Sequence, residues 1–287
     1  TLCYSFRTRN TIYWRILSSM EFTAPVTNTL FCALDCETTG LNPIIDRIVS
    51  IGLIHFTVDK VVDSFYTLVN PLKPIPPHVT MLHGITAAMV EKAPTISELF
   101  ATIERFTAKA YCVIHNPRFD LSFIDSAFHQ YGKTTPDIKA FDTVHLARKT
   151  FKQMPSYNLG KLCSHFGITI NAHHALSDAE GSMEIFKRII ERLNAENWCI
   201  RDLERYHGGI ISADSLAMRS TRNPIDSRIP LGYRITIIYK DASGNMLERS
   251  ILPQRYFIIG KNNYIQAYCY LRNEIRYFNT ARIIAVH

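Results

Sequence analysis

Apolar positions in the first two thirds of the chain follow the periods of strands and of helices in turn. Short apolar runs predict four strands, the second and third joined in a hairpin by the turn at Asp59 and Lys60: residues 30–35, 48–58, 61–69 and 111–115. Apolar residues three and four positions apart predict four helices, over residues 96–108, 121–131, 143–151 and 178–194. This order predicts an α/β fold with a mixed sheet, because a hairpin comes first and strands alternating with helices follow it.

The pattern changes after residue 194. Gly, Ser, Asn and Pro gather in the next thirty residues, and short strands at a spacing typical of a small barrel follow: 233–239, 247–251, 256–259, 264–271 and 275–278. We therefore expect an α/β domain over 29–195, a linker over 196–229 and a small all-β domain over 230–287. Residues 1–28 are expected to form an N-terminal extension outside the core.

Composition excludes several classes of protein. The chain has 287 residues, 47% hydrophobic and 20% charged, which is typical of a globular protein and not of a disordered or fibrous one. No apolar run approaches the roughly 18 residues that a membrane span needs, so we expect no membrane association. The seven cysteines form no CxxC pair, which indicates neither a disulfide framework nor a zinc knuckle and favours a reducing compartment.

The first nineteen residues carry three arginines and no acidic residue. This composition fits a transit peptide, but it also fits an upstream extension that ends before Met20, and the extension is the favoured interpretation.

Positive charge is concentrated at the C-terminal end. The net charge is +7, yet residues 29–199 hold 16 basic against 17 acidic residues, whereas residues 230–287 hold eight basic against three. A basic module beside a nearly neutral one suggests a polyanionic partner such as nucleic acid. A solvated basic surface explains the same charge equally well.

Acidic residues lie at the ends of several predicted elements. Asp35 and Glu37 close the first strand, where residues two apart point to the same side, so their carboxylates converge. Two like charges repel unless a cation lies between them, and carboxylate oxygens suit Mg²⁺ or Mn²⁺. Asp120 and Asp178 begin predicted helices, where each could simply cap the helix. Capping does not predict the whole set, in which His173 also precedes Asp178 by five residues.

Three motifs in this set resemble those of the DEDDh, or DnaQ-like, 3′–5′ exonucleases. The DxETTG motif appears at Asp35–Gly40, the HNxxFD motif at His115–Asp120 and the HxAxxD motif at His173–Asp178, in this order. The resemblance covers residues 29–195. It implies an RNase H-like fold, in which a mixed five-stranded sheet is flanked by helices.

The resemblance also implies an enzyme that hydrolyses a terminal phosphodiester with two divalent cations, Mg²⁺ or Mn²⁺. Asp35, Glu37 and Asp178 would hold one cation, and Asp35 with Asp120 would hold the other. His173 would be the general base, since an imidazole pKa near neutrality suits proton removal. His174 would replace it if the register of the loop differed. The product would be a nucleoside 5′-monophosphate.

The implied substrate is single-stranded DNA or RNA with a free 3′ end, with DNA favoured. Its terminal nucleotide would contact six further residues of the motifs: Thr38, Thr39, Gly40, Leu41, Asn116 and Phe119. For Leu41, burial in the core is the more common fate of such a residue. Two other functions remain open: a proofreading subunit attached to a DNA polymerase, as used in replication or repair, and a regulatory protein in which the nuclease fold is only a scaffold.

The C-terminal residues 229–287 resemble the WYL domain, a small Sm-like or SH3-like barrel. The resemblance rests on Tyr264–Tyr268 and Leu271–Phe278, although Asn263 and Ile265 stand where the family has Trp and Leu. It implies a bacterial cytoplasmic protein that contacts nucleic acid or a nucleotide-like ligand. We expect the aromatic residues to fill the barrel for the most part, and three arginines to touch the ligand: Arg272, Arg276 and Arg282.

Overall fold

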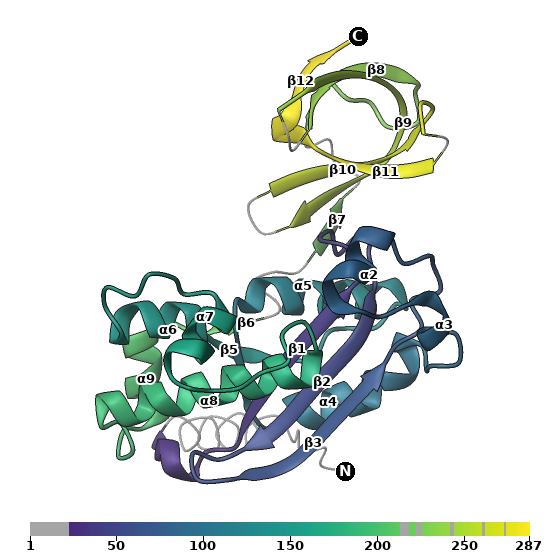
Figure 1. The fold of residues 1–287 in the computed structure, drawn as a ribbon. Helices are drawn as coiled ribbons and strands as arrows, with labels where there is room; N and C mark the ends of the chain where they lie inside the picture. The colour runs from purple at the N-terminus through teal and green to yellow at the C-terminus, as the bar shows by residue number, and fades with distance from the viewer. Residues whose placement is uncertain (1–22, 213–217, 222–225, 242–243, 260–261, 273) are drawn as a thin grey trace, which may run out of the picture. The chain divides into compact units, whose positions relative to one another are not determined.

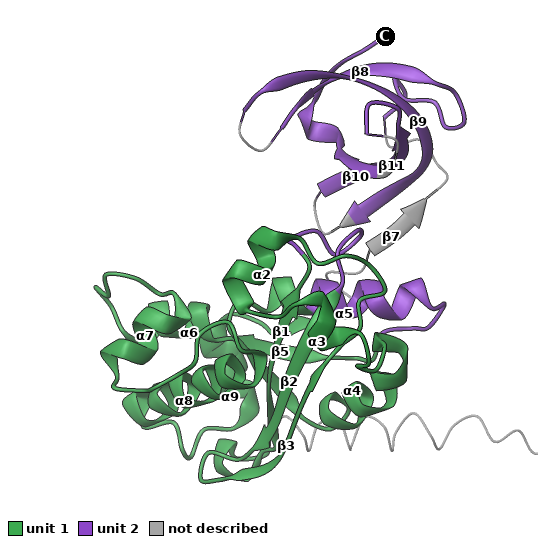
Figure 2. Ribbon diagram, turned by 45° about the vertical axis from the view of Figure 1, so that its right-hand side comes forward, with its two compact units in different colours: residues 1–39, 48–120, 136–212 green, residues 40–47, 121–135, 213–287 purple. Residues whose placement is uncertain are grey.

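The computed structural model describes residues 23–212, 218–221, 226–241, 244–259, 262–272 and 274–287. Its chain contacts divide it into two compact units, coloured separately in Figure 2. The first comprises residues up to 39, 48–120 and 136–212, and the second comprises 40–47, 121–135 and 213–287. Residues 1–22 of the predicted extension lie outside the described residues, as do residues 213–217 and 222–225 of the predicted linker.

The first unit is built on a six-stranded mixed sheet with the order β3-β2-β1-β4-β5-β6 (Figure 1). Its strands are β1 (Phe31–Thr38), β2 (Ile48–Phe56), β3 (Val61–Leu68), β4 (Tyr111–Ile114), β5 (Lys139–Asp142) and β6 (Ile211–Ser212). The β1–β2–β3 meander is antiparallel, β4 and β5 run parallel to β1, and β6 is antiparallel to β5. The expected RNase H-like α/β fold is confirmed, and the short β6 adds one edge strand to the five that were predicted.

The helices of the first unit are mostly short. They are α2 (Pro77–His83), α3 (Ala87–Val90), α4 (Phe100–Thr107), α6 (Thr143–Thr150), α7 (Leu159–His165), α8 (Ala175–Leu193) and α9 (Ile200–His207), with 3-10 turns η1 (Val26–Asn28) and η2 (Ile96–Leu99). Helix α5 (Pro117–Gln130) begins in this unit. Among the described residues, no helix combines the length and the apolar character that crossing a bilayer requires.

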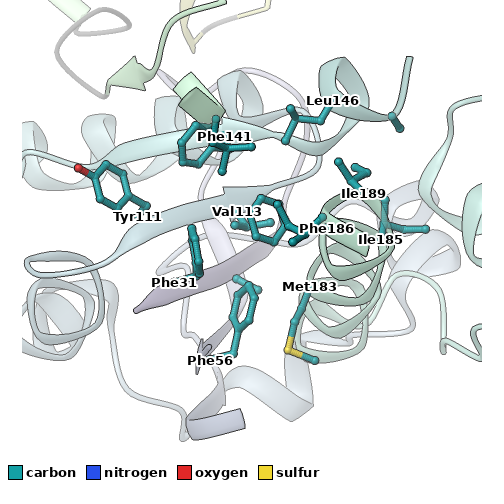
Figure 3. Packing of buried hydrophobic residues seen from close by; sticks show 14 of the residues in the cluster. Phe31, Phe56, Tyr111, Val113, Phe141, Leu146, Met183, Ile185, Phe186 and Ile189 are labelled. Carbon is teal, nitrogen blue, oxygen red and sulfur yellow. The ribbon is translucent and has the colours of Figure 1, made fainter. Parts of the chain in front are cut away.

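Helix α8 covers one face of the sheet, and α4 lies on the other. Phe31 of β1 contacts Phe186 of α8 with a ring-centroid distance of 4.9 Å, within the apolar cluster of Figure 3. On the opposite face, the ring of His55 lies 4.4 Å from that of Phe106 in α4, and its Nε2 bonds the Phe106 carbonyl at 2.7 Å. Alternation along β1 therefore directs Phe31, Ala33, Asp35 and Glu37 toward α8.

Both ends of the predicted α/β domain differ from expectation. Val26, placed by the sequence in the extension, is fully buried, and its amide donates to the Trp198 carbonyl at 2.8 Å. The stretch predicted as a linker begins with α9, whose His207 Nε2 accepts a hydrogen bond from the Asp142 amide at 3.0 Å. Tertiary packing explains both differences. These segments are too short to show a clear hydrophobic periodicity, and they are stabilised by packing against the rest of the domain.

The second unit contains a separate antiparallel sheet with the order β11-β10-β9-β8-β12, and β7 pairs with β9. Its strands are β7 (Met218–Thr221), β8 (Ile235–Lys240), β9 (Met246–Ile259), β10 (Asn262–Cys269), β11 (Glu274–Asn279) and β12 (Ile283–Val286). The first part of β9 pairs with β8 and the rest with β10, so that Ile251 faces a partner on each side. The sheet curls round on itself (Figure 1), as expected for a small barrel.

The interior of this sheet is more aliphatic than the sequence suggested. Ile265, Ala267 and Cys269 of β10 are fully buried, together with Phe278 and Tyr256, whereas the intervening Tyr264 and Tyr268 are only half-buried. The prediction that most aromatic residues fill the barrel is therefore wrong for β10. The strand's alternation places its tyrosines on the outer face.

Gly52 allows α8 to approach the sheet closely. A Cβ atom built at this position would lie 2.5 Å from the Leu176 amide nitrogen and 2.6 Å from the Ala175 carbonyl oxygen. Both contacts are to backbone, so a side chain here cannot be accommodated by a rotamer change. The start of α8 is thereby placed directly over the centre of β2.

We predict that Gly52→Ala destabilises the protein by about 1–3 kcal/mol, because overpacking forces the backbone of α8 to shift. Urea unfolding measures the change. Gly160→Ala in α7 is the matched control, since its Cβ would lie 3.5 Å from Asn158 Oδ1, an ordinary contact. That control is expected to be neutral or stabilising by up to about 1 kcal/mol, and equal destabilisation by the two variants would contradict the close-approach argument.

Candidate active site

Strand β1 carries the first two carboxylates of the site. Asp35 lies opposite Gly52 and Glu37 opposite Ser50 in the antiparallel pairing with β2, so both carboxylates point toward α8. Glu37 is 9% exposed, and Asp35 is half-buried. They occupy the end of β1 where the strand leaves the sheet.

Asp120 joins this pair from the first turn of α5. It is 2% exposed, and its Oδ1 accepts a hydrogen bond from the Cys36 amide at 2.9 Å. The turn that leads into α5 places Asn116 in the left-handed region, at φ 68°, and the Asn116 amide donates to Asp142 Oδ1 at 3.2 Å. Asp120 is thus tied directly to the strand that bears Asp35 and Glu37, and it does not cap α5.

Asp178 and His173 come from the start of α8. Asp178 Oδ2 accepts a hydrogen bond from the His173 amide at 2.9 Å, which joins the loop to the helix. His173 has φ 64° and its side chain is exposed. A non-glycine residue in this conformation is uncommon and is frequently found at functional sites. The N-cap position of α8 belongs to His174, so Asp178 does not serve as a cap.

These residues converge on one point. Ligand atoms of Glu37, His173 and Asp178 all lie within 4.8 Å of one another. Besides burial, the negative charges of three neighbours raise the pKa of Asp35, so these side chains lie close to it: Asp120, Asp178 and Glu37. The five residues that the sequence predicts as metal ligands and general base are therefore brought together, and a donor set of carboxylate oxygens with one imidazole fits a divalent cation.

Burial and mutual repulsion make the carboxylates resist ionisation. Burial raises the pKa of Glu37 to about 7, with the Asp178 charge contributing, and raises that of Asp120 to about 8. The pKa of Asp35 lies well above its usual range because of burial and its three acidic neighbours, and burial also raises that of Asp178. A cation would offset this repulsion.

The predicted strand-end residues take varied positions. Thr38 and Thr39 are buried. At Gly40, a Cβ would clash with the carboxylate of the Asp46 side chain. The alternative that Leu41 belongs to the core is wrong, because its side chain is 84% exposed.

The remaining predicted contact residues are accessible to differing degrees. Asn116 is exposed and Phe119 is half-buried. Arg272, Arg276 and Arg282 are exposed on the second unit.

The sequence assigns no role to three residues near the site. Tyr66 of β3 stacks on His174 with a centroid distance of 4.4 Å, and no motif marks it. His83 is half-buried; burial lowers its pKa and the charge of His173 adds to this, which indicates that it lies near the site. His115 is structural: its ring nitrogens bond Thr143 Oγ1 at 2.8 Å and the Tyr157 carbonyl at 3.0 Å.

Comparison with known proteins agrees with this geometry. Residues 32–186, more than half of the chain, match the family model described as "Exonuclease", and residues 225–287 match the WYL domain. The chain belongs to the DnaQ-like, DEDDh exonuclease family. This membership confirms the prediction of an enzyme of the nuclease class, and members of this family depend on divalent metal ions.

Relatives of this exonuclease domain include two bacterial proteins named as DNA polymerase III. The chain is 34% identical over 170 residues to DNA polymerase III subunit epsilon of Treponema pallidum, covering 58% of the chain and 79% of that protein. It is 34% identical over 235 residues to DNA polymerase III PolC-type of Caldanaerobacter subterraneus, covering 81% of the chain. The match spans only 15% of that much longer relative.

Solved structures share the fold at lower identity. Exonuclease I of E. coli in complex with a dA16 oligonucleotide superposes with a TM-score of 0.55 and 16% identity, covering 81% of the chain and 55% of that structure. The nuclease domain of 3'hExo, a DEDDh family member bound to rAMP, superposes with a TM-score of 0.52 and 17% identity. The match covers 61% of the chain and 98% of that structure.

The raised pKa values predict how stability depends on pH without metal. Between the ordinary pKa of Glu37, 4.5, and its folded value of about 7, the folded state binds more protons than the unfolded state, so stability falls as pH rises. Asp120 extends the loss to about pH 8. In EDTA we expect the free energy of unfolding to fall by at least about 2 kcal/mol between pH 5 and pH 9.

Two further arms make this prediction specific. Asp120→Asn removes one of the charges and is expected to flatten the pH profile. Asp202→Asn, in the first turn of α9, is not expected to flatten it. Millimolar Mg²⁺ or Mn²⁺ is expected to restore stability at pH 8. A profile in EDTA that rises from pH 5 to pH 9 would contradict the raised pKa values.

Proposed function

We propose that the chain removes nucleotides from the 3′ end of single-stranded nucleic acid, with DNA favoured over RNA, and releases nucleoside 5′-monophosphates. The observation that supports this most strongly is the convergence of four carboxylates, from β1, α5 and α8, beside the exposed imidazole of His173. Such a cluster is costly to fold and has no use in a scaffold. Membership of the exonuclease family supports the same reaction.

Two divalent cations, Mg²⁺ or Mn²⁺, would be held by the carboxylates, one by Asp35, Glu37 and Asp178 and the other by Asp35 and Asp120. When bound, they would supply Lewis acidity that stabilises negative charge on the phosphate oxygens and lowers the pKa of water. Hard carboxylate oxygens favour these two metals over softer ones.

His173 would accept the proton of the attacking water at a ring nitrogen. The water oxygen forms a bond to the terminal phosphorus, and the bond from phosphorus to the preceding O3′ breaks. The exposure of His173 allows a strand end to approach it, and the Asp178–His173 hydrogen bond holds the loop for this role. His174 is stacked on Tyr66 and is the weaker candidate for the base.

The terminal nucleotide would lie against Thr38, Thr39 and Gly40, with Leu41 available to press on the last base. The exposure of Leu41 supports this assignment, since an 84% exposed leucine contributes nothing to a core. Asn116 and Phe119 would complete the pocket.

The C-terminal domain, over residues 230–287, would also contact the nucleic acid. Exposed Arg272, Arg276 and Arg282 would contact phosphates.

A DNA polymerase is the proposed protein partner, in a proofreading role. This rests on the similarity to subunit epsilon, of which the chain covers 79%. The bacterial source of the relatives supports a cytoplasmic location. A regulatory role for the WYL-like domain is compatible with the nuclease activity and does not replace it.

Degradation of end-labelled strands tests the proposal. With Mg²⁺ or Mn²⁺ we expect stepwise shortening from the 3′ end of single-stranded DNA, faster than of RNA, and none in EDTA. Asp35→Ala and His173→Ala are expected to lower the rate at least about 100-fold, because each removes a group that acts on the reacting atoms. Asp202→Ala and His165→Ala, which lie on α9 and α7, are the matched controls and are expected to retain activity. No cleavage by the wild type with either metal would overturn the proposal.

A further inference from the structure

The loop that carries His173 is bonded mainly to its own helix. The Asn171 amide donates to Ser177 Oγ at 2.8 Å, and the His173 amide donates to Asp178 Oδ2 at 2.9 Å. Both acceptors belong to the first turn of α8. These bonds shape the loop, but they do not fix it against the sheet that carries Asp35 and Glu37.

A row of three residues crosses the sheet beneath this loop. Gly52 of β2 lies opposite Asp35 on one side and opposite Tyr66 of β3 on the other, and directly opposed residues share a face. The missing side chain at Gly52 is the place where α8 approaches the strand. Asp35 therefore flanks the start of α8 on one side and Tyr66 flanks it on the other.

Tyr66 contacts the loop itself. Its ring stacks on that of His174, with centroids 4.4 Å apart and planes inclined by 25°. Tyr66 is half-buried, and burial raises the pKa of its phenol. The charge of Glu37 adds to this increase, which indicates that the ring lies near the acidic cluster. His174 is joined to His173 by one peptide bond, so the stack restrains the residue beside the general base.

We propose that Tyr66 is a positioning residue, whose ring holds His174 and thereby fixes the His173 imidazole against the acidic cluster. This inference rests on the proposed function. The left-handed backbone of His173 is strained and persists only where its surroundings enforce it. The stack on Tyr66 supplies a restraint from the sheet, and proton transfer by a base depends steeply on such placement.

Hydrogen exchange of the metal-free protein tests the restraint without any activity. Tyr66→Ala is expected to increase the exchange rate of the peptide over 171–178 about tenfold, because the His173 amide loses its fixed acceptor geometry. Tyr66→Phe keeps the ring and is expected to behave as the wild type. Phe65→Ala is the matched control: this neighbour on β3 contacts Phe106 on the other face, at 6.3 Å, and the loop is expected to be unchanged.

Kinetics then test the consequence for the reaction. We expect Tyr66→Ala and His174→Ala each to lower kcat about tenfold or more with KM within about twofold, and the double variant to be no slower than either single one. Tyr66→Phe should restore kcat. Equal loop exchange in Tyr66→Ala and Phe65→Ala, or a Tyr66→Phe variant as slow as Tyr66→Ala, would overturn the proposal. An inactive wild type whose loop still depends on Tyr66 would refute the proposed function and leave the restraint established.

Discussion

Repulsion among four clustered carboxylates, three of them buried and Asp35 half-buried, is the constraint on which the structure of the first unit depends. Asp35 and Glu37 are adjacent on one face of β1, Asp120 is bonded to the same strand, and α8 brings Asp178 from above. Each would separate from the others if its element were free to move. The central position of β1 in the sheet, the close approach of α8 at Gly52 and the apolar cluster around Phe186 together prevent that movement.

The acidic set was predictable from sequence because its chemistry is local. Asp35 and Glu37 can be identified by their spacing at the end of a predicted strand. Asp120 and Asp178 can be identified by their position at the start of predicted helices. Contacts between distant segments were not predictable. Nothing in the sequence near Gly52 or Tyr66 indicates that α8 crosses one and His174 stacks on the other, since both contacts arise only when the sheet and helix are assembled.

The fold shows the same division. Long apolar patterns predicted β1, β2, β3 and α8 closely. The elements that were missed have at most eight residues each: α2, α3, β5, α7, α9, β6, β7 and β12. Short elements are stabilised by what they pack against and carry little periodicity. The C-terminal strands were predicted as strands, but the sequence did not show which side of β10 faces inward. In the structure, the face of β10 with the smaller side chains is buried, and the face with the tyrosines is only half-buried. The buried residues are Ile265, Ala267 and Cys269.

The helices on the two faces of the sheet therefore contribute differently to the site. On one face, the Phe106 carbonyl of α4 bonds the His55 ring and holds the helix against the sheet. On the other face, two contacts that allow little adjustment hold α8: a close backbone approach at Gly52 and an aromatic stack at its N-cap residue, His174. Rigid placement of like charges stores repulsion in the metal-free protein, and that repulsion favours the binding of cations. The same feature that lowers stability thus prepares the site for metal.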